Sequence, residues 1–260
     1  MFARLFSRRR QDHAPRGPAG SRAYAIGDVH GRYDLLLELL TTIERDNAQR
    51  EPARTYLIML GDLVDRGPDS RAVVDYFVVN PPTWAQTVHI KGNHEEYLLS
   101  ILEGKREVVG KWLAHGGQEC ASSYGVSAGW TLNASSEAIA ERMRQLVPAG
   151  HRKLMENMAD TFRFGDYLFV HAGIRPGIPV EEQSSHDLRL IREGFLEDTT
   201  DHGAVIVHGH TIVPEPEEHV NRIALDTGAY RTGCLTALGI AGADRWFLQS
   251  RRASQEQDFR

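Results

Sequence analysis

The chain has 260 residues, of which 41% are hydrophobic and 25% charged, and its formal net charge is −5 at pH 7. This balance is typical of a folded globular protein and excludes a fibrous, disordered or generally polyanion-binding chain. Two cysteines, Cys120 and Cys234, are too few for a disulfide scaffold or an all-thiolate zinc site. No apolar run approaches the roughly 18 residues that a membrane span needs.

Residues 1–21 form a basic segment in which five arginines stand against a single aspartate, Asp12. We expect a flexible arm here, with a weak contact to an anionic membrane or to nucleic acid as the alternative. The negative charge of the remaining chain argues against a specific nucleic-acid partner. The apolar residues before the arginines are too few for a secretory segment, so we expect a cytoplasmic protein with reduced thiols.

Short apolar runs recur after this arm, and a polar cluster containing glycine follows each of them. Runs of this length with little alternation are typical of strands that are buried on both faces. The predicted strands are Tyr24–Ile26, Tyr56–Leu60, Thr87–Ile90, Tyr167–Val170, Ala204–Val207 and Arg222–Leu225.

Helical patterns separate the first three predicted strands. Apolar residues at positions 36, 39, 40 and 43 lie on one helical face, and those at 73, 74, 77 and 78 lie on a second. Asp69 or Ser70 would cap the second helix, and Asn80-Pro81-Pro82 would end it. Alternating strands and helices are typical of crossover connections in an α/β sheet.

From Phe162 onward the pattern changes to antiparallel pairs. Gly165-Asp166 suits a two-residue hairpin turn, and residues 241–244 suit a longer one. We therefore expect mixed sheets. Residues 104–160 are instead helical and punctuated by glycine, and we interpret them as a helical cap inserted into one domain that spans residues 22–248. A polar tail would follow at residues 249–260.

Residues able to bind metal follow five of the predicted strands. Because open α/β sheets gather their ligand sites at the carboxyl ends of strands, these side chains are expected to meet in one crevice. The set consists of Asp28, His30, Asp62, Asn93, His94, His171, His208 and His210. Oxygen and imidazole ligands without thiolate favour manganese, iron or zinc. Two such ions lower the pKa of a water molecule to about 7 and polarise a phosphoryl oxygen, so the pattern predicts hydrolysis of a phosphate ester.

Five sequence blocks carry a family resemblance. They occur in the order GDVHGR (27–32), GDLVDRGP (61–68), GNHE (92–95), HAG (171–173) and GHT (209–211). These blocks resemble the phosphoprotein phosphatase family of binuclear, calcineurin-like metallophosphoesterases, especially its compact bacterial and phage-type members. The resemblance extends over about residues 23–248, and residues 112–117 resemble the W…GG segment of the family's cap. It implies an α/β fold in which a β-sandwich of mixed sheets is flanked by helices and carries a helical cap.

The resemblance also implies a set of metal ligands. Asp28 and His30 would bind one divalent ion, and Asp62 would bridge it to a second. The second ion would be held by Asn93, His171 and His210, with His208 supporting from nearby. Manganese is the expected metal, with iron, zinc and magnesium as alternatives.

Further residues would act on the substrate. By resemblance, His94 would be the general acid, oriented by Asp65, while Arg66 and Arg192 would bind phosphate oxygens. Three additional substrate contacts are proposed from their positions, with a purely structural role as the alternative for the first two: Lys91, His115 and Tyr230.

The expected function is that of a metal-dependent phosphomonoesterase, namely a serine/threonine-type protein phosphatase acting on a phosphorylated protein or a small phosphoester. The alternative is a symmetric diadenosine tetraphosphate hydrolase or another phosphodiesterase of the superfamily. In the symmetric branch a small residue replaces the aspartate before Arg-Gly-Pro and GNHE becomes GNHD, so Asp65 and Glu95 favour the phosphomonoesterase. A catalytically silent metal-binding module would not need His94, Asp65 or Arg66.

Overall fold

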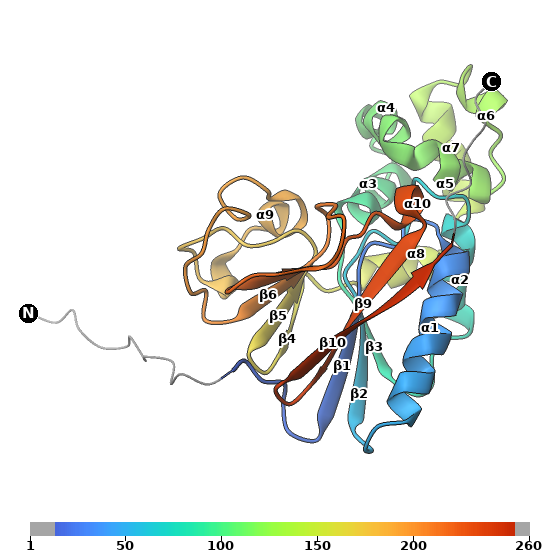
Figure 1. The fold of residues 1–260 in the computed structure, drawn as a ribbon. Coiled ribbons are helices and arrows are strands. Elements are labelled where there is room, and N and C mark those ends of the chain that lie inside the picture. The colour runs from blue at the N-terminus through green and yellow to red at the C-terminus, as the bar shows by residue number, and fades with distance from the viewer. Residues whose placement is uncertain (1–13, 253–260) are drawn as a thin grey trace, which may run out of the picture.

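Two five-stranded sheets packed face to face form the centre of the molecule, and helices cover their outer sides (Figure 1). The computed structural model describes residues 14–252. The strand order is β10-β9-β1-β2-β3 in the first sheet and β4-β5-β6-β8-β7 in the second. Each sheet contains parallel and antiparallel pairs, so the prediction of mixed sheets is confirmed.

The first sheet begins with the predicted crossover pattern. Its elements are β1 (Ser21–Ile26), α1 (Tyr33–Ala48), β2 (Arg54–Met59), α2 (Ser70–Val79), β3 (Gln86–His89), β9 (Cys234–Ala241) and β10 (Asp244–Arg251). Helices α1 and α2 lie on its outer side (Figure 1). The predicted apolar stripe of α1 is buried there, because its leucines pack against the sheet. Helix α2 begins after Asp69 and ends at Val79, as predicted.

The second sheet comes from the later part of the chain. Its elements are β4 (Thr161–Phe164), β5 (Tyr167–Val170), β6 (Val205–His208), β7 (Glu217–Glu218) and β8 (Arg222–Ala224), with α9 (Ser185–Leu190) outside them. The predicted hairpin turn at Gly165-Asp166 joins β4 to β5. The turn between β9 and β10 is shorter than predicted: Asp244 pairs with Ala241, because Gly242 adopts a φ of 58° that permits a two-residue turn.

The space between the sheets is filled by apolar side chains from both. Ala25 and Ile58 of the first sheet meet Phe169 and Val207 of the second in one buried cluster. At 20–33 cal/mol per Å², such burial is the main force that joins the sheets. With the sheets packed in this way, the carboxyl ends of their parallel strands lie on one side of the molecule.

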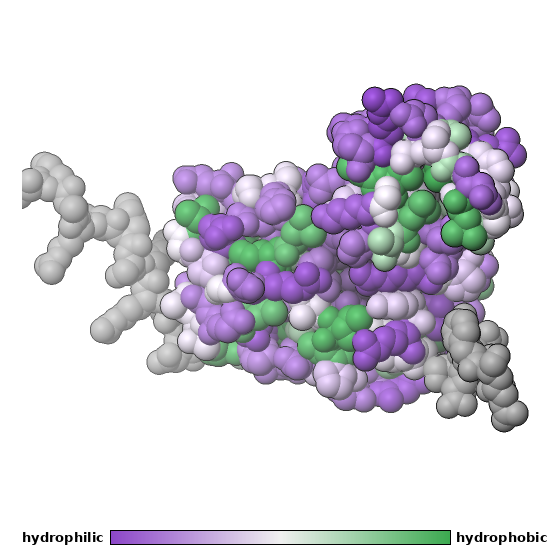
Figure 2. Space-filling view, turned by 90° about the horizontal axis from the view of Figure 1, so that it is seen from above, coloured by the Kyte–Doolittle hydropathy of each residue, from purple (hydrophilic) through white to green (hydrophobic). Residues whose placement is uncertain are grey.

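Residues 106–146 form a helical cap above the first sheet, and residues 149–156 lie behind the upper end of that sheet (Figure 1). Between β3 and β4 the chain forms α3 (Asn93–Leu102), η1 (Arg106–Val108), α4 (Val109–Trp112), η2 (Leu113–Gly117), α5 (Gln118–Ser123), α6 (Ala128–Thr131), α7 (Ser136–Leu146) and α8 (Ala149–Glu156). His151 of α8 contacts α2: its Nε2 atom lies 2.7 Å from an Asp75 carboxylate oxygen. Viewed from above, hydrophilic residues cover much of the cap's outer side, and hydrophobic side chains form small separate patches (Figure 2).

The ends of the folded unit differ from the predicted boundaries. Residues 1–13 of the predicted arm and residues 253–260 of the predicted tail lie outside the described residues. The Arg16 amide donates to the Asp166 carboxylate (2.9 Å), and the Gly17 amide donates to the Gly242 carbonyl (2.8 Å). The chain therefore joins the fold before residue 22, because its backbone pairs with two hairpin turns. Strand β10 likewise runs past residue 248 to Arg251. No described helix is both long and apolar enough to span a membrane.

Candidate metal and phosphate site

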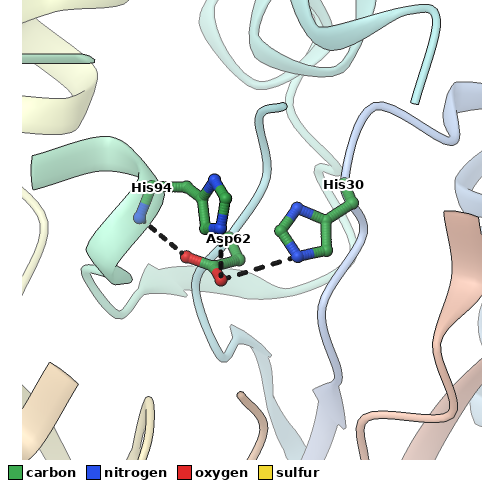
Figure 3. Close-up of side chains that lie close together, drawn as sticks. All are labelled: His30, Asp62 and His94. Carbon is green, nitrogen blue, oxygen red and sulfur yellow. Dashed lines mark hydrogen bonds and ion pairs between the residues drawn. The ribbon is translucent and has the colours of Figure 1, made fainter. Parts of the chain in front are cut away.

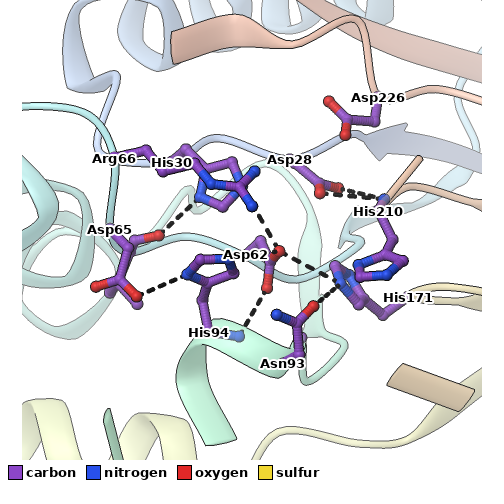
Figure 4. Close-up of polar contacts among 12 residues, drawn as sticks. Asp28, His30, Asp62, Asp65, Arg66, Asn93, His94, His171, His210 and Asp226 are labelled. Atoms are coloured by element: carbon purple, nitrogen blue, oxygen red, sulfur yellow. Dashed lines mark hydrogen bonds and ion pairs between the residues drawn. The ribbon is translucent and has the colours of Figure 1, made fainter. Parts of the chain in front are cut away.

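The turns that follow five strands meet at one place (Figure 4). Asp28 and His30 follow β1, and Asp62 follows β2. Asn93 and His94 open α3 after β3, His171 follows β5, and His210 follows β6. Each of these side chains belongs to a buried residue. The structure thus brings the predicted metal-binding set together, including residues that are about 180 positions apart.

Unusual backbone conformations are concentrated in these turns. Within the described chain, the non-glycine residues with positive φ are His30, Asp62, Asp65, Arg66 and His210. Such conformations cost of order 1–3 kcal/mol each and persist only where the surroundings enforce them. Close approach adds a second constraint: a Cβ on Gly92 would lie 2.1 Å from the Asp62 Oδ1 atom.

The Asp62 carboxylate lies at the centre of the cluster (Figure 3). Its Oδ2 atom is 3.4 Å from the Nε2 atom of His171, 3.6 Å from that of His30 and 3.8 Å from that of His94. Burial alone would raise the pKa of Asp62. The surrounding histidines outweigh that effect and hold this pKa well below its usual value, so the carboxylate is ionised.

Glu95 fixes the two turns that carry Asp62 and His94. Its buried carboxylate accepts from the backbone amides of Asp62 (2.9 Å), Leu63 (2.7 Å) and Gly92 (3.0 Å). From the sequence, Glu95 was used only as a marker of substrate class, and this role was not predicted. Its position in the first turn of α3 was an available signal, because a glutamate there commonly reaches back to the amide before the helix.

The histidine tautomers follow from their hydrogen bonds to backbone carbonyls. The Nδ1–H of His30 donates to the Val64 carbonyl (2.9 Å), and that of His171 donates to the Leu60 carbonyl (2.8 Å). A carbonyl can only accept, so Nδ1 carries a proton in both rings and Nε2 is the atom directed into the cluster. Imidazoles that bind metals are oriented in this way.

The arrangement fits divalent cations. Two trios have donor atoms within 4.8 Å of one another, namely His30, Asp62 and His94, and Asp62, His171 and His210. The buried Nε2 atom of His210 has no hydrogen-bond partner among the described residues. Burial disfavours a charged His171 ring, but the Asp62 carboxylate raises its pKa to about 10. A cation would replace that proton between the same two groups.

The carboxylates of Asp28 and Asp226 lie together in this cluster. Asp28 accepts the His210 amide (3.1 and 3.2 Å), and Asp226 lies beside it (Figure 4). Burial together with the charge of Asp226 raises the pKa of Asp28 well above its usual value. Burial likewise raises the pKa of Asp226 to about 6, and its Oδ2 atom has no partner in residues 14–252. Asp226 was not assigned to the site from the sequence, although it directly follows the predicted strand Arg222–Leu225, as the other residues follow theirs.

The predicted acid and its partner form a buried pair. His94 Nδ1 lies 2.7 Å from an Asp65 carboxylate oxygen. Burial disfavours the charged ring, but the carboxylates of Asp62 and Asp65 outweigh burial and raise the pKa of His94. The Trp112 indole nitrogen of the cap donates to the same Asp65 carboxylate (3.0 and 3.1 Å).

The other predicted substrate residues occupy different surroundings. Arg66 Nη1 lies 2.8 Å from His30 Nε2, and its guanidinium carbon is 5.0 Å from the Tyr230 ring centre. Tyr230 also packs edge-on against His30 at 5.4 Å. Arg192 is exposed, and its Nη2 atom approaches the His210 carbonyl at 3.4 Å. These three residues therefore lie next to the strand-end cluster.

Lys91 and His115 are not brought into the cluster. The Lys91 amine donates to the Glu156 carbonyl (3.3 Å), at the end of α8. His115 is exposed and its Nδ1 atom bonds to the Lys111 carbonyl (2.7 Å) within the cap. His208 is buried beneath the site, where its ring packs against Phe195 at 5.2 Å.

Comparison with known families agrees with this geometry. The chain matches the family profile described as Calcineurin-like phosphoesterase over residues 21–238. The protein belongs to this family. It is accordingly a hydrolase that acts on phosphate esters.

Three curated relatives align over most of their length. A symmetrical bis(5'-nucleosyl)-tetraphosphatase from Dechloromonas aromatica is 31% identical, and the alignment covers 84% of this chain and 92% of the relative. An asymmetrical bis(5'-nucleosyl)-tetraphosphatase from Anoxybacillus flavithermus is 28% identical, with 82% and 88% covered. Serine/threonine-protein phosphatase 1 from Salmonella typhimurium is 25% identical, with 84% and 91% covered.

Solved structures share the fold. One that is provisionally named a diadenosine tetraphosphatase superposes with a TM-score of 0.62 at 18% identity and covers 93% of this chain and 100% of its own. A cold-active protein tyrosine phosphatase superposes with a TM-score of 0.54 at 18% identity, with 90% and 80% covered. The predicted α/β metallophosphoesterase fold, with two mixed sheets flanked by helices, is confirmed.

Proposed function

We propose that this protein hydrolyses bis(5'-nucleosyl) tetraphosphates. The support is the set of relatives with that name, which are 28–31% identical over most of the chain, against 25% for the relative named as a protein phosphatase. These comparisons favour the alternative sequence interpretation over the serine/threonine phosphatase that was expected first.

The residues that favoured a phosphomonoesterase do not decide the substrate. Glu95 binds backbone amides within the fold. Asp65 is fully buried between His94 and Trp112. Side chains that serve internal hydrogen bonds do not read the substrate directly, so both are compatible with hydrolysis of a phosphoric anhydride.

Two divalent ions are proposed as cofactors, with manganese expected and iron, zinc or magnesium as alternatives. Asp62 would be shared between them, and the other ligands would be Asp28, His30, Asn93, His171 and His210. The fit rests on the clustered donor atoms and on the unpartnered His210 nitrogen. When bound, such a pair lowers the pKa of a water molecule and polarises a phosphoryl oxygen.

His94 is assigned to proton donation although its Nε2 atom belongs to one of the trios. The Nδ1–H groups of His30 and His171 donate to neutral carbonyls, and their Nε2 atoms face the Asp62 carboxylate. A bound cation would replace the Arg66 contact at His30 and the proton at His171. The Nδ1–H of His94 instead donates to the Asp65 carboxylate, which favours a second proton on Nε2. A protonated ring cannot ligate a metal but can protonate a leaving group.

In the proposed reaction, water attacks a phosphorus atom of the substrate. The oxygen of water forms a new bond to phosphorus, while the bridging P–O bond breaks and leaves its electron pair on the departing oxygen. That oxygen takes a proton from His94 Nε2, and the attacking water releases one to solvent. A departing phosphate has a last pKa of about 6, so it needs this proton far less than an alkoxide does.

Arg66 and Arg192 are proposed to bind the polyphosphate chain. The planar guanidinium group matches pairs of phosphate oxygens, and Arg66 already lies against His30 at the centre of the site. Arg192 is exposed at the His210 side and would contact a phosphate farther along the chain. Tyr230 flanks Arg66 and is proposed as a contact to the substrate.

Hydrolysis of protein phosphoesters is the second candidate. The specific observation in its favour is the buried His94–Asp65 pair, because a serine alkoxide requires a strong proton donor. The Salmonella relative named as a protein phosphatase agrees with it.

One assay separates the two candidates. Purified protein with manganese is given diadenosine tetraphosphate or a phosphoserine peptide, and the nucleotides are separated by chromatography. We expect the tetraphosphate to be favoured by about tenfold or more in kcat/KM. Two ADP indicate symmetrical cleavage, and ATP with AMP indicates asymmetrical cleavage. Hydrolysis of the peptide alone would overturn the proposal, and Asp62→Asn protein controls for contaminating phosphatases.

A further inference from the structure

The turn at Asp65 and Arg66 is held in an unfavourable conformation. Two successive non-glycine residues have positive φ there, 71° and 65°. Such a turn persists only when several contacts enforce it. Outside the cap, the Ser70 hydroxyl accepts the Asp65 amide (2.9 Å), His94 bonds to the Asp65 carboxylate, and Arg66 contacts His30. Further contacts come from the cap.

The cap contacts this turn through residues 112–117. The Gly116 carbonyl accepts the Arg66 amide (2.9 Å), and the Trp112 indole nitrogen donates to the Asp65 carboxylate. Trp112 and Asp65 both have zero exposure, so neither side chain can exchange its partner for water. The cap therefore supplies one bond to each residue of the strained turn.

Glycine is required where the cap meets the turn. At Gly116, where φ is 98°, an added Cβ would lie 2.5 Å from the Arg66 Cγ atom and 2.7 Å from its amide nitrogen. At Gly117 it would lie 2.2 Å from the Trp112 ring. The backbone of η2 can approach this closely only because both side chains are absent.

We propose that Trp112 is a positioning residue for proton donation: its indole N–H holds the Asp65 carboxylate against His94, so that proton donation depends on the docked cap. This rests on the proposed role of His94. Asp65 receives Trp112 through both oxygens and His94 through one. If the indole N–H is removed, the carboxylate loses the donor that contacts both of its oxygens and is free to turn away from His94. Partners that orient an active group in this way contribute about 10- to 100-fold to activity.

Positioning of Asp65 and packing alone predict different effects of a Trp112 substitution on the reaction rate. A packing defect lowers the rate for all substrates by a similar factor. A defect in proton donation lowers the rate most for leaving groups that are strong bases, because those depend on the proton in the transition state. The dependence of rate on leaving-group pKa therefore distinguishes the two roles.

The test uses Trp112→Phe, which keeps an aromatic ring and removes the N–H. The control is Trp130→Phe, in which a cap tryptophan that is 41% exposed is changed in the same way. kcat and KM are measured with manganese on aryl and alkyl phosphomonoesters of graded leaving-group pKa. We expect the loss in kcat to rise from a few-fold to about 10- to 100-fold along the series, with KM little changed.

Asp65→Asn is the second variant of a double-mutant cycle with Trp112→Phe. It should show the same leaving-group dependence, and combining it with Trp112→Phe should add little, because both break one link. A uniform loss across the series, or no loss, would overturn the proposal. Phosphomonoesters are used throughout, so a failure to hydrolyse tetraphosphates would remove the proposed function and leave this test intact.

A second measurement needs no change at Trp112. In the full-length protein, the indole N–H resonance of Trp112 is followed by NMR before and after Asp65→Asn, with Trp130 as internal reference. We expect slow hydrogen exchange in the wild type, and a shifted resonance with faster exchange in the variant. A Trp112 resonance that does not respond to Asp65→Asn contradicts the proposal, whether or not Trp112→Phe folds.

Discussion

The strand-end turns and the cap contribute to the site in different ways. The turns supply the proposed metal-binding groups, such as Asp62 and His171, and the two sheets determine where these groups lie. The cap supplies contacts to groups that the turns already carry, through Trp112 and Gly116. Topology therefore places the reactive groups to within a few ångströms, and tertiary hydrogen bonds between distant segments set their final orientation.

The largest effect is expected at the centre of the turns. Asp62→Asn should abolish activity and metal binding together, because the neutral amide loses the charge that Asp62 presents to both trios. Elemental analysis after dialysis against manganese measures the metal content. Asp69→Asn, at an exposed aspartate of the same loop, is the matched control. Two tightly retained ions in Asp62→Asn would contradict its central position.

The next effect separates the acid from the ligands. His94→Ala should keep both metals and lower turnover of a phosphoserine peptide by about 10²–10⁴-fold. The loss on diadenosine tetraphosphate should be smaller, because a phosphate leaves with little protonation. Steady-state kinetics and elemental analysis of the same preparation check both statements. Loss of one metal ion would show that His94 is a ligand.

A smaller effect is expected at the rim. Arg192→Ala should raise the KM for the tetraphosphate by several-fold and leave kcat nearly unchanged, because an exposed arginine contributes binding rather than chemistry. Arg163→Ala, at an exposed arginine of β4, serves as the control. If both variants have wild-type kinetics, Arg192 has no role in substrate binding.

The smallest effect concerns the junction between cap and turn. Burial, with the charge of Asp65, raises the pKa of the Cys120 thiol well above its usual value. The folded state then keeps a proton that the unfolded state releases above pH 8.5, so stability should fall by about 1 kcal/mol per pH unit in that range. The raised pKa of His171 gives a slope of the same sign in this range, so Cys120→Ala should lessen the total slope by that amount. Urea unfolding between pH 7.5 and 9.5 measures it, and equal slopes for both proteins would contradict a docked cap.

The sequence predicted much of the fold and of the candidate site for a physical reason. Each residue of the candidate site follows a buried apolar strand, and the carboxyl ends of these strands meet on one side of the two packed sheets. Position in sequence therefore indicated position in space for Asp28, Asp62 and His171. The hairpin turn at Gly165-Asp166 was equally local and was predicted correctly.

Features that depend on distant contacts were not predicted. The bond from Trp112 to Asp65 spans 47 positions and has no local signature. Asp226 does follow a predicted strand, but its strand end reaches the site through the pairing of β8 with β6, which that segment alone does not reveal. The start of the folded unit was placed too late, because the backbone bonds of Arg16 and Gly17 to two hairpins leave no apolar pattern.

We infer that the strand-end residues form one site for a pair of cations. Crystals grown with excess manganese and measured at the manganese absorption edge would reveal such a pair. We expect two anomalous peaks about 3.5–4 Å apart, with Asp62 between them, His30 beside one and His171 and His210 beside the other. A single peak, or none within reach of Asp62, would contradict it.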